Sequence, residues 1–542
     1  MTPLFEFIGG LLDGLGLLAL ALSVGGVTYA LVVLRAAGPL TPILRTVSEQ
    51  TLRAIAFAGG GLAILRCARL ALKLLALGDG ASIQNLWEFA GTQVFRAGLL
   101  SAVLAACIAA AALWVRRDPV SRNRWTVLIL TAGMFLIAEA GLSHAVSRVE
   151  ERALLMTVTI AHVLGAGAWA GGVAHLLLSW RLLRRRPEAP ALWPLLVTRF
   201  SPLGVVSVLM IVGPGLCLAQ TYVGEWHGLV GTGYGNMLLV KIALFAMVLM
   251  LAATNFLAAR RWRVLDDSSR LFGCVPAFIE VEFLLAAGLL VTAATLAGFP
   301  PAVDVTDHAA SSEQVWGMFK PKLPQLSGPE LVLVEAPEHT DLKTGTSGLK
   351  EEWDWDSFNH NAAGVILLMI SGLALFDRVC GHSWARHWPL LLVLFSLLIV
   401  FFANPGEWPL GPLGFLESLQ DAEVVQHWLA AAVVFALGVF EWRARQGLLA
   451  GRNPAFFFPL LCVTGGIVLL THSHGIVELK QEFLVQSTHV AMGLVAVLVG
   501  CCRWLELRLP SPHDRLAGFV SLAGMMQVGF MLLFYINPDL LR

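Results

Sequence analysis

Long apolar runs recur along the whole chain, and they constrain its fold more than any other feature. The first three are Gly9–Val33, Ala54–Leu77 and Ala97–Val115, and each is close to the roughly 20 residues that an α-helix needs to cross the hydrocarbon of a bilayer. Hydrophobic residues make up 57% of the 542 residues and charged residues only 14%, a composition typical of membrane proteins. The sequence therefore predicts an all-α, polytopic transmembrane helix bundle of about fourteen spans.

Arginine is concentrated in every second loop between these runs. Cytoplasmic loops retain Lys and Arg, whereas translocated loops carry few. The loops around Arg116, Arg184 and Arg260 are rich in arginine, and the intervening segments 78–92 and 222–235 contain none. This alternation predicts a multi-pass protein of the bacterial inner membrane with both termini in the periplasm. The first segment has no basic region and no clear cleavage site, so we interpret it as a retained first helix.

A polar segment interrupts the apolar runs near the middle of the chain. Residues 299–358 contain prolines and many charged side chains, which makes them too hydrophilic for hydrocarbon. We interpret them as a periplasmic linker between an N-terminal block of about eight spans, residues 1–298, and a C-terminal block of about six spans, residues 359–542. We find no convincing sequence repeat between the two blocks.

Motifs of common enzyme chemistry are missing from the sequence. It contains no Walker motif, no GxSxG, no HExxH and no dinucleotide-binding fingerprint, so ATP-driven pumping, hydrolysis and nicotinamide chemistry have no support. The net charge is zero, which gives no reason to expect a nucleic-acid partner. The eight cysteines show no CxxC spacing, and we expect them to pack rather than to form disulfides or a zinc site. We expect a protein that is not an enzyme.

Histidines collect at the ends of spans that the topology places at the periplasmic face. His144 ends the fourth span, and His162 lies about two turns into the fifth, so the two belong to adjacent helices. A second group shares the same end of the C-terminal block. Imidazole suits copper, zinc and haem iron, although each ring can instead simply bond a backbone carbonyl or water. The candidate metal ligands are His144, His162, His427, His472, His474 and His489.

Two carboxylates lie inside an apolar span near its cytoplasmic end. They are Glu280 and Glu282, and ionisable groups at such depth are costly. Because positions i and i+2 face different sides of a helix, we expect different partners for them, with Lys241 and the cytoplasmic arginines as candidates. The pattern fits either a structural ion pair or a relay for cations or protons.

Sulfur side chains form a further candidate feature of the spans. Met247 and Met250 are three residues apart on one face of the seventh span, and Cys217 lies in the sixth. Thioethers and thiolates favour Cu(I), while filling space in a core is the commoner role of methionine. We include all three in a candidate transport path.

The N-terminal block contains the stretches SHA (Ser143–Ala145), AHVLGAGAWAGGV (Ala161–Val173), RFSPLGVVSV (Arg199–Val208), GTGYGNMLLVK (Gly231–Lys241) with Asn255 after it, and IEVEFLLAAGLLVTA (Ile279–Ala293). Together these stretches resemble the copper resistance protein D (CopD) family. The linker stretch WGMFKPKLPQLSGP and the later THSHG look like the longer, two-block members of that family. The resemblance implies an inner-membrane protein that moves copper from periplasm to cytoplasm, beside a periplasmic copper-binding protein. Carried over by position, it implies a polar set of His144, His162, Trp169, Tyr234, Lys241, Asn255, Glu280 and Glu282.

Two other functions stay open at this stage. Paired histidines on neighbouring helices also hold haem b in helix bundles, which would make the protein a cytochrome-like redox subunit. The third reading is an assembly factor for a copper enzyme. The sequence does not distinguish Cu(I) from Cu(II), and it leaves open what drives transport and whether the chain forms a homo-oligomer.

Overall fold

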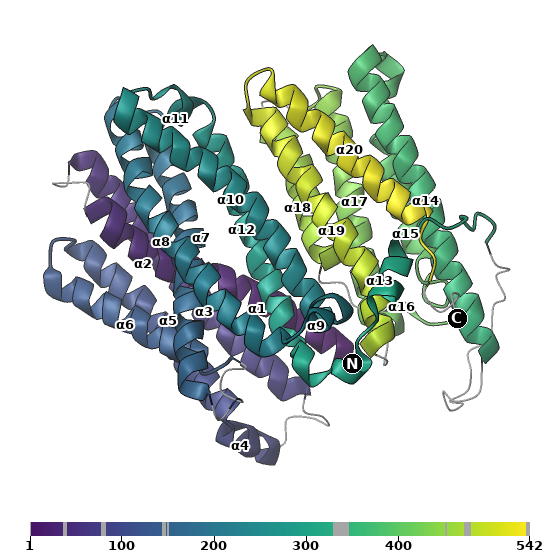
Figure 1. The fold of residues 1–542 in the computed structure, drawn as a ribbon, viewed down its shortest axis with the longest axis horizontal. Coiled ribbons are helices and arrows are strands. Elements are labelled where there is room, and N and C mark those ends of the chain that lie inside the picture. The colour runs from purple at the N-terminus through teal and green to yellow at the C-terminus, as the bar shows by residue number, and fades with distance from the viewer. Residues whose placement is uncertain are drawn as a thin grey trace.

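The computed structural model describes residues 2–35, 41–76, 83–143, 148, 151–328, 346–449, 453–470 and 479–537. Within these ranges every regular element is a helix, and the long helices lie side by side in one bundle (Figure 1). The predicted all-α bundle is confirmed.

Twelve stretches of the described helices are long and apolar enough to cross a membrane. Two further helices, α6 (Arg122–Ala140) and the shorter apolar α18 (Phe457–Leu470), lie against α5 (Gln93–Arg117) and α19 (Leu479–Arg508) respectively. With these two, the described part of the chain has the fourteen long helices that the sequence predicts. The number that actually crosses the bilayer stays a prediction.

The N-terminal block begins with one long, partly π-helical span and continues through seven further long helices. Its elements are α1 (Thr2–Leu20), η1 (Ala21–Gly25), α2 (Gly26–Tyr29), η2 (Ala30–Leu34), α3 (Pro42–Ala76), α4 (Ile83–Gly91), α5, α6, α7 (Arg152–Leu183), α8 (Ala189–Val223), α9 (Trp226–Gly231), α10 (Gly233–Leu265), α11 (Ser269–Gly273) and α12 (Val275–Gly298).

The linker and the C-terminal block follow. The described elements are η5 (Ala302–Asp304), η6 (Thr306–His308), α13 (Ser312–Phe319), α14 (Thr346–Cys380), η7 (Ser383–His387), α15 (Leu390–Phe402), α16 (Phe415–Ser418), α17 (Ala422–Arg445), η8 (Asn453–Phe456), α18, α19 and α20 (His513–Leu533).

Figure 1 shows that α1 begins and α20 ends at the same end of the bundle, together with α4, α9, α13 and α16. The turn that carries α11, next to the arginine-rich end of α10, lies at the opposite end. This arrangement agrees with the two-sided distribution of arginine. That the end with the termini faces the periplasm stays a prediction from charge.

Close approach of backbones fixes the first span against α7. A Cβ at Gly171 would collide with the carbonyl oxygen of Ala21, and a Cβ at Gly25 would collide with that of Gly167, so these helices need glycine where they cross. In the π-helical turn η1, the Leu22 carbonyl accepts from the backbone N–H of Gly26 and also accepts a 2.9 Å hydrogen bond from Nε2 of the buried His175.

The two blocks share part of their core. Leu285 and Leu289 of α12 belong to the same cluster of buried apolar residues as Val490 and Val497 of α19. The outward faces carry many exposed apolar side chains, among them Leu216 of α8. These are the surfaces that contact membrane lipid.

Candidate functional site

A buried carboxyl group lies between α10 and α12. Glu282 is 2% exposed, and its Oε1 accepts a hydrogen bond of 2.5 Å from Nδ2 of Asn255. Among the described residues, Oδ1 of Asn255 has no hydrogen-bond partner and no basic side chain pairs with Glu282. A negative charge here has only a neutral amide beside it, which is costly in a low-dielectric interior. The position therefore suits the binding of a cation or a proton.

Glu280, two positions earlier, has a different environment. Its carboxylate accepts hydrogen bonds from Nε and Nη2 of Arg508, at 2.8 and 2.9 Å, and from Nε1 of Trp504 at 2.9 Å. The prediction that the two glutamates have different partners is confirmed, and Glu280 pairs with an arginine, which is one of the two kinds of partner expected for it. Within the described part of the chain, Lys241 pairs with neither glutamate.

His162 lies between α7 and α8, opposite a proline-containing turn. Its Nδ1 donates a hydrogen bond of 2.9 Å to the carbonyl of Ile211. Pro214 lies inside α8, and a Cβ added at the adjacent Gly215 would contact the imidazole ring, so the small residue makes room for it. Lys241 of α10 is near enough to act on this ring electrostatically. His162 and Lys241 thus form a second polar pair, distinct from that of Glu282.

The aromatic members of the predicted set are packed in the core. Trp169 of α7 is buried, and its ring meets Phe245 of α10 edge-on with 6.1 Å between centroids. Tyr234, at the start of α10, lies 6.4 Å from the ring of Tyr222. Their contacts are those of packing residues that fix α7, α8 and α10 together.

The sulfur side chains do not gather at one point. Met247 is half-buried against the core, but Met250 is 65% exposed on the outer surface of α10. Cys217 of α8 is a half-buried free cysteine. The expectation that Met247 and Met250 line an interior path together is therefore not supported for Met250, because the helix turns it outward.

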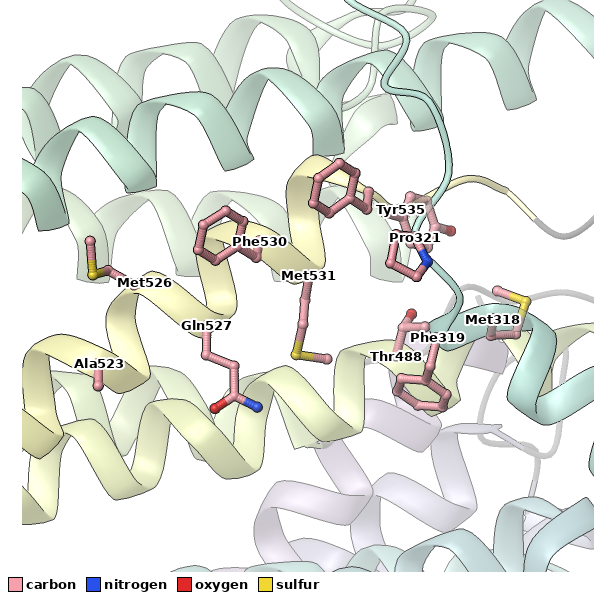
Figure 2. A pocket seen from close by; sticks show the side chains of 11 residues that line it. Met318, Phe319, Pro321, Thr488, Ala523, Met526, Gln527, Phe530, Met531 and Tyr535 are labelled. Carbon is pink, nitrogen blue, oxygen red and sulfur yellow. The ribbon is translucent and has the colours of Figure 1, made fainter.

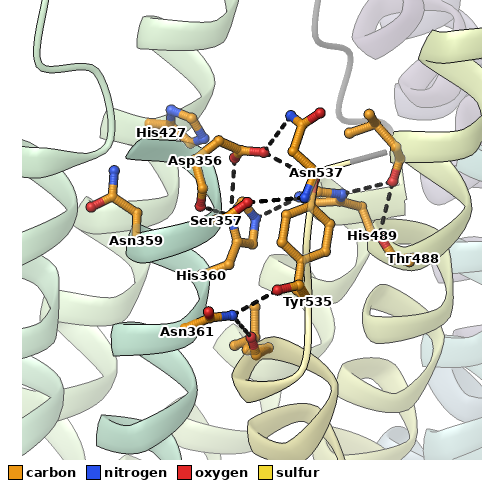
Figure 3. Close-up of polar contacts among 12 residues, drawn as sticks. Asp356, Ser357, Asn359, His360, Asn361, His427, Thr488, His489, Tyr535 and Asn537 are labelled. Carbon is orange, nitrogen blue, oxygen red and sulfur yellow. Dashed lines mark hydrogen bonds and ion pairs between the residues drawn. The ribbon is translucent and has the colours of Figure 1, made fainter. Parts of the chain in front are cut away.

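In the C-terminal block, His489 of α19 meets a histidine outside the predicted set. Its Nε2 lies 3.1 Å from Nε2 of His360 on α14 (Figure 3). The sequence analysis missed His360 as a site residue because it lies where the polar linker passes into a span. The polar side chains between Asp356 and Asn361 at that boundary could have indicated a site there.

The other predicted ligands fall in different places. His427 of α17 has its Nδ1 2.7 Å from Oδ1 of Asn404, and Figure 3 shows it on the helix beside Asp356. His144, His472 and His474 lie outside the described residues. Among the residues that the structure does describe, no group of three or more His, Cys, Asp or Glu is arranged to hold a metal ion.

These features define a polytopic helical membrane protein with ionisable groups buried between its spans. Residues 194–296, which run from α8 to α12, match the family model described as Copper resistance protein D, CopD. Over 219 residues the chain is 29% identical to the "Copper transport protein CutJ" of Bacillus subtilis (strain 168). Both matches agree with the resemblance to the CopD family that the sequence shows.

The extent of these matches is limited. The aligned segment covers 40% of this chain and 38% of the Bacillus protein, so the chain matches well under half of that relative's length. No solved structure matches the chain. The segment matched by the family model contains Cys217, Tyr234, Lys241, Asn255 and both glutamates, whereas the His360 and His489 pair lies beyond it.

Proposed function

We propose that this protein handles copper by moving the ion, as Cu(I) or Cu(II), across the inner membrane from periplasm to cytoplasm. Two findings support it: the matching family is described by copper resistance, and the Bacillus relative is named a copper transport protein. In this proposal a separate periplasmic copper-binding protein delivers the ion, as the family resemblance implies.

The observation that carries the proposal is the pair of Asn255 and Glu282 inside the matched segment. An ion that leaves water for a helix bundle loses its hydration, and a nearby carboxylate compensates for that loss. Glu282 is 2% exposed and its hydrogen-bond partner is a neutral amide. Among the described residues no arginine neutralises its carboxyl group, as Arg508 does that of Glu280, so the group can release a proton and take up a passing cation.

The two polar pairs of the N-terminal block lie at different depths. With a rise of 1.5 Å per residue, His162 and Lys241 lie about 15 and 12 Å from the starts of α7 and α10, at the end predicted to be periplasmic. Asn255 and Glu282 lie about 15 and 10 Å from the opposite ends of α10 and α12. In our proposal His162 receives the ion and Glu282 accepts it on the inner side.

Copper accumulation in cells tests this function. Cells that lack their own copper importers and express the wild-type protein should gain copper, measured by mass spectrometry, and the Glu282→Gln and Asn255→Ala variants should reduce that gain at least tenfold. Thr254→Val is the matched control, because Thr254 is adjacent on α10 but exposed. Wild-type accumulation in Glu282→Gln cells would overturn the proposed path.

The alternative in which a histidine pair holds haem finds no support in the described geometry. Of the histidines that this alternative would use, His144, His472 and His474 lie outside the described residues, and His489 meets His360, which the alternative does not include. An absorption spectrum separates the cases, since a Soret band from purified protein supports the redox subunit. An assembly factor would accumulate no copper in the cell assay.

A further inference from the structure

His360 and His489 present matching nitrogen atoms to each other from helices far apart in the chain. His360 is in the second half of a polar run on α14, and His489 is 4% exposed on α19. Their Nε2 atoms are 3.1 Å apart and their ring planes are nearly perpendicular, at 88° (Figure 3). The arrangement makes two ring nitrogens converge on a small volume between two helices.

The other nitrogen of each ring is already committed as a donor. Nδ1 of His489 lies 3.0 Å from the carbonyl oxygen of Val485. Nδ1 of His360 lies 2.8 Å from the carbonyl oxygen of Asp356 and 3.0 Å from its Oδ1. Carbonyl and carboxylate oxygens only accept, so both Nδ1 atoms carry hydrogen. In the neutral rings, both Nε2 atoms therefore present lone pairs.

Two lone pairs that face each other at this distance repel unless an electrophile lies between or beside them. A backbone carbonyl or carboxylate on one ring nitrogen, with the second nitrogen directed at a common point, is the outer-shell pattern of metal-bound histidine. We propose that His360 and His489 are two ligands of a Cu(I) site in the C-terminal block. The identity of the ion rests on the proposed copper function, whereas the existence of the site rests on the geometry of the two rings.

The separation of the nitrogens fits ligands that are neighbours on one metal ion. With metal–nitrogen bonds of about 2.0 Å, Nε2 atoms 3.1 Å apart subtend an angle of about 100° at the metal. Such an angle leaves further coordination positions open for an ion that arrives and departs. A structural site that closes all four positions would not allow that exchange.

Asp356 organises the surroundings of the pair. Besides His360, its carboxylate accepts hydrogen bonds from the Tyr535 hydroxyl at 3.0 Å and from Nδ2 of Asn537 at 2.8 Å. The Tyr535 ring lies against the His360 ring with 4.2 Å between centroids. These contacts fix the orientation of His360.

A methionine-lined pocket adjoins the pair. It has a volume of about 460 Å³, and its walls include Met318, Met526 and Met531 (Figure 2). Thr488, next to His489, and Tyr535, which touches His360, also line it. Thioether sulfur prefers Cu(I) over harder ions such as Mg²⁺. Through Thr488 and Tyr535 the methionine-lined pocket borders the surroundings of the pair, and its soft side chains are why we assign Cu(I).

Competition for Cu(I) against the chromogenic chelator bicinchoninate tests the site on purified full-length protein. His360→Gln and His489→Gln should each bind one Cu(I) fewer per chain than wild type. His382→Gln is the matched control, because His382 lies just beyond the other end of α14 and its ring contacts that of Phe376. X-ray absorption of the Cu(I)-loaded wild type should show imidazole scattering, and the amplitude of that scattering should fall in both variants.

Unchanged Cu(I) stoichiometry in both variants overturns the proposal. An X-ray absorption spectrum of the wild type without imidazole scattering also overturns it, because the two rings would then share only a proton. The absorption measurement uses the wild type, so it decides the question even where a variant fails to fold. Loss of the site with normal cellular copper accumulation would leave the proposed transport intact. A site that binds Cu(I) in a chain that accumulates no copper would overturn transport alone.

Discussion

Glu280 on α12 and Arg508 on α19 form a bidentate ion pair, with hydrogen bonds of 2.8 and 2.9 Å. One helix belongs to the N-terminal block and the other to the C-terminal block. The pair lies at the end of the bundle that the arginines mark as cytoplasmic. The ion pair therefore joins the two blocks. Glu280 has this structural role, whereas Glu282 has the proposed role in ion transport.

Replacing Glu280 by Gln should weaken the contact between the blocks. Arg508, whose side chain is 28% exposed in the wild type, then has no carboxylate to pair with. Removing one partner of a partly buried ion pair costs about 2 kcal/mol of stability. We expect a lower midpoint of thermal unfolding in detergent. The double variant Glu280→Gln/Arg508→Gln should lose less than the sum of the single variants, and Glu313→Gln, at an exposed position of α13, should not change the midpoint. A single variant as stable as wild type contradicts the role.

The crossing of α7 with the first span should not tolerate a methyl group. Alanine at position 171 brings a Cβ into the carbonyl oxygen of Ala21, so the helices must separate at a cost of about 2 kcal/mol. The matched control is Gly204→Ala on α8, where nothing lies within contact distance and alanine favours the helix. The measurement is the yield of monodisperse protein after detergent extraction. Equal yields of the two variants would show that the close approach does not limit folding.

Features that depend on local sequence could be predicted, while features that depend on how helices meet could not. Span length and loop charge are local, so the long helices and an arginine partner for Glu280 followed from the sequence. His360 and His489 are 129 residues apart, and no periodicity indicates that α14 and α19 bring them together. Spacing likewise placed Met247 and Met250 on one helix face without showing that Met250 points outward.

Changing Asp356 to Asn should weaken Cu(I) binding at the proposed pair without removing a ligand. The carboxylate accepts from His360, Tyr535 and Asn537, and an amide has only one oxygen to share among them. Loss of such outer-shell partners lowers metal affinity by about 10 to 100-fold. The chelator competition measures this change, with Asp354→Asn as the control two residues away. An affinity within twofold of wild type would show that Asp356 does not position His360.

Changing Lys241 to Gln should increase copper accumulation at low external copper. The ammonium acts on His162 across the gap between α7 and α10, and no carboxylate pairs with it among the described residues, so it repels a cation that approaches that ring. Removing a repulsion of about 1.4 kcal/mol raises occupancy about tenfold. The gain should disappear in the double variant Lys241→Gln/His162→Gln, and Lys320→Gln in the exposed linker should have no effect. A cation held by the His162 imidazole must respond to the charge of the Lys241 ammonium. If copper accumulation in Lys241→Gln cells stays constant or falls, the path of the ion does not pass His162.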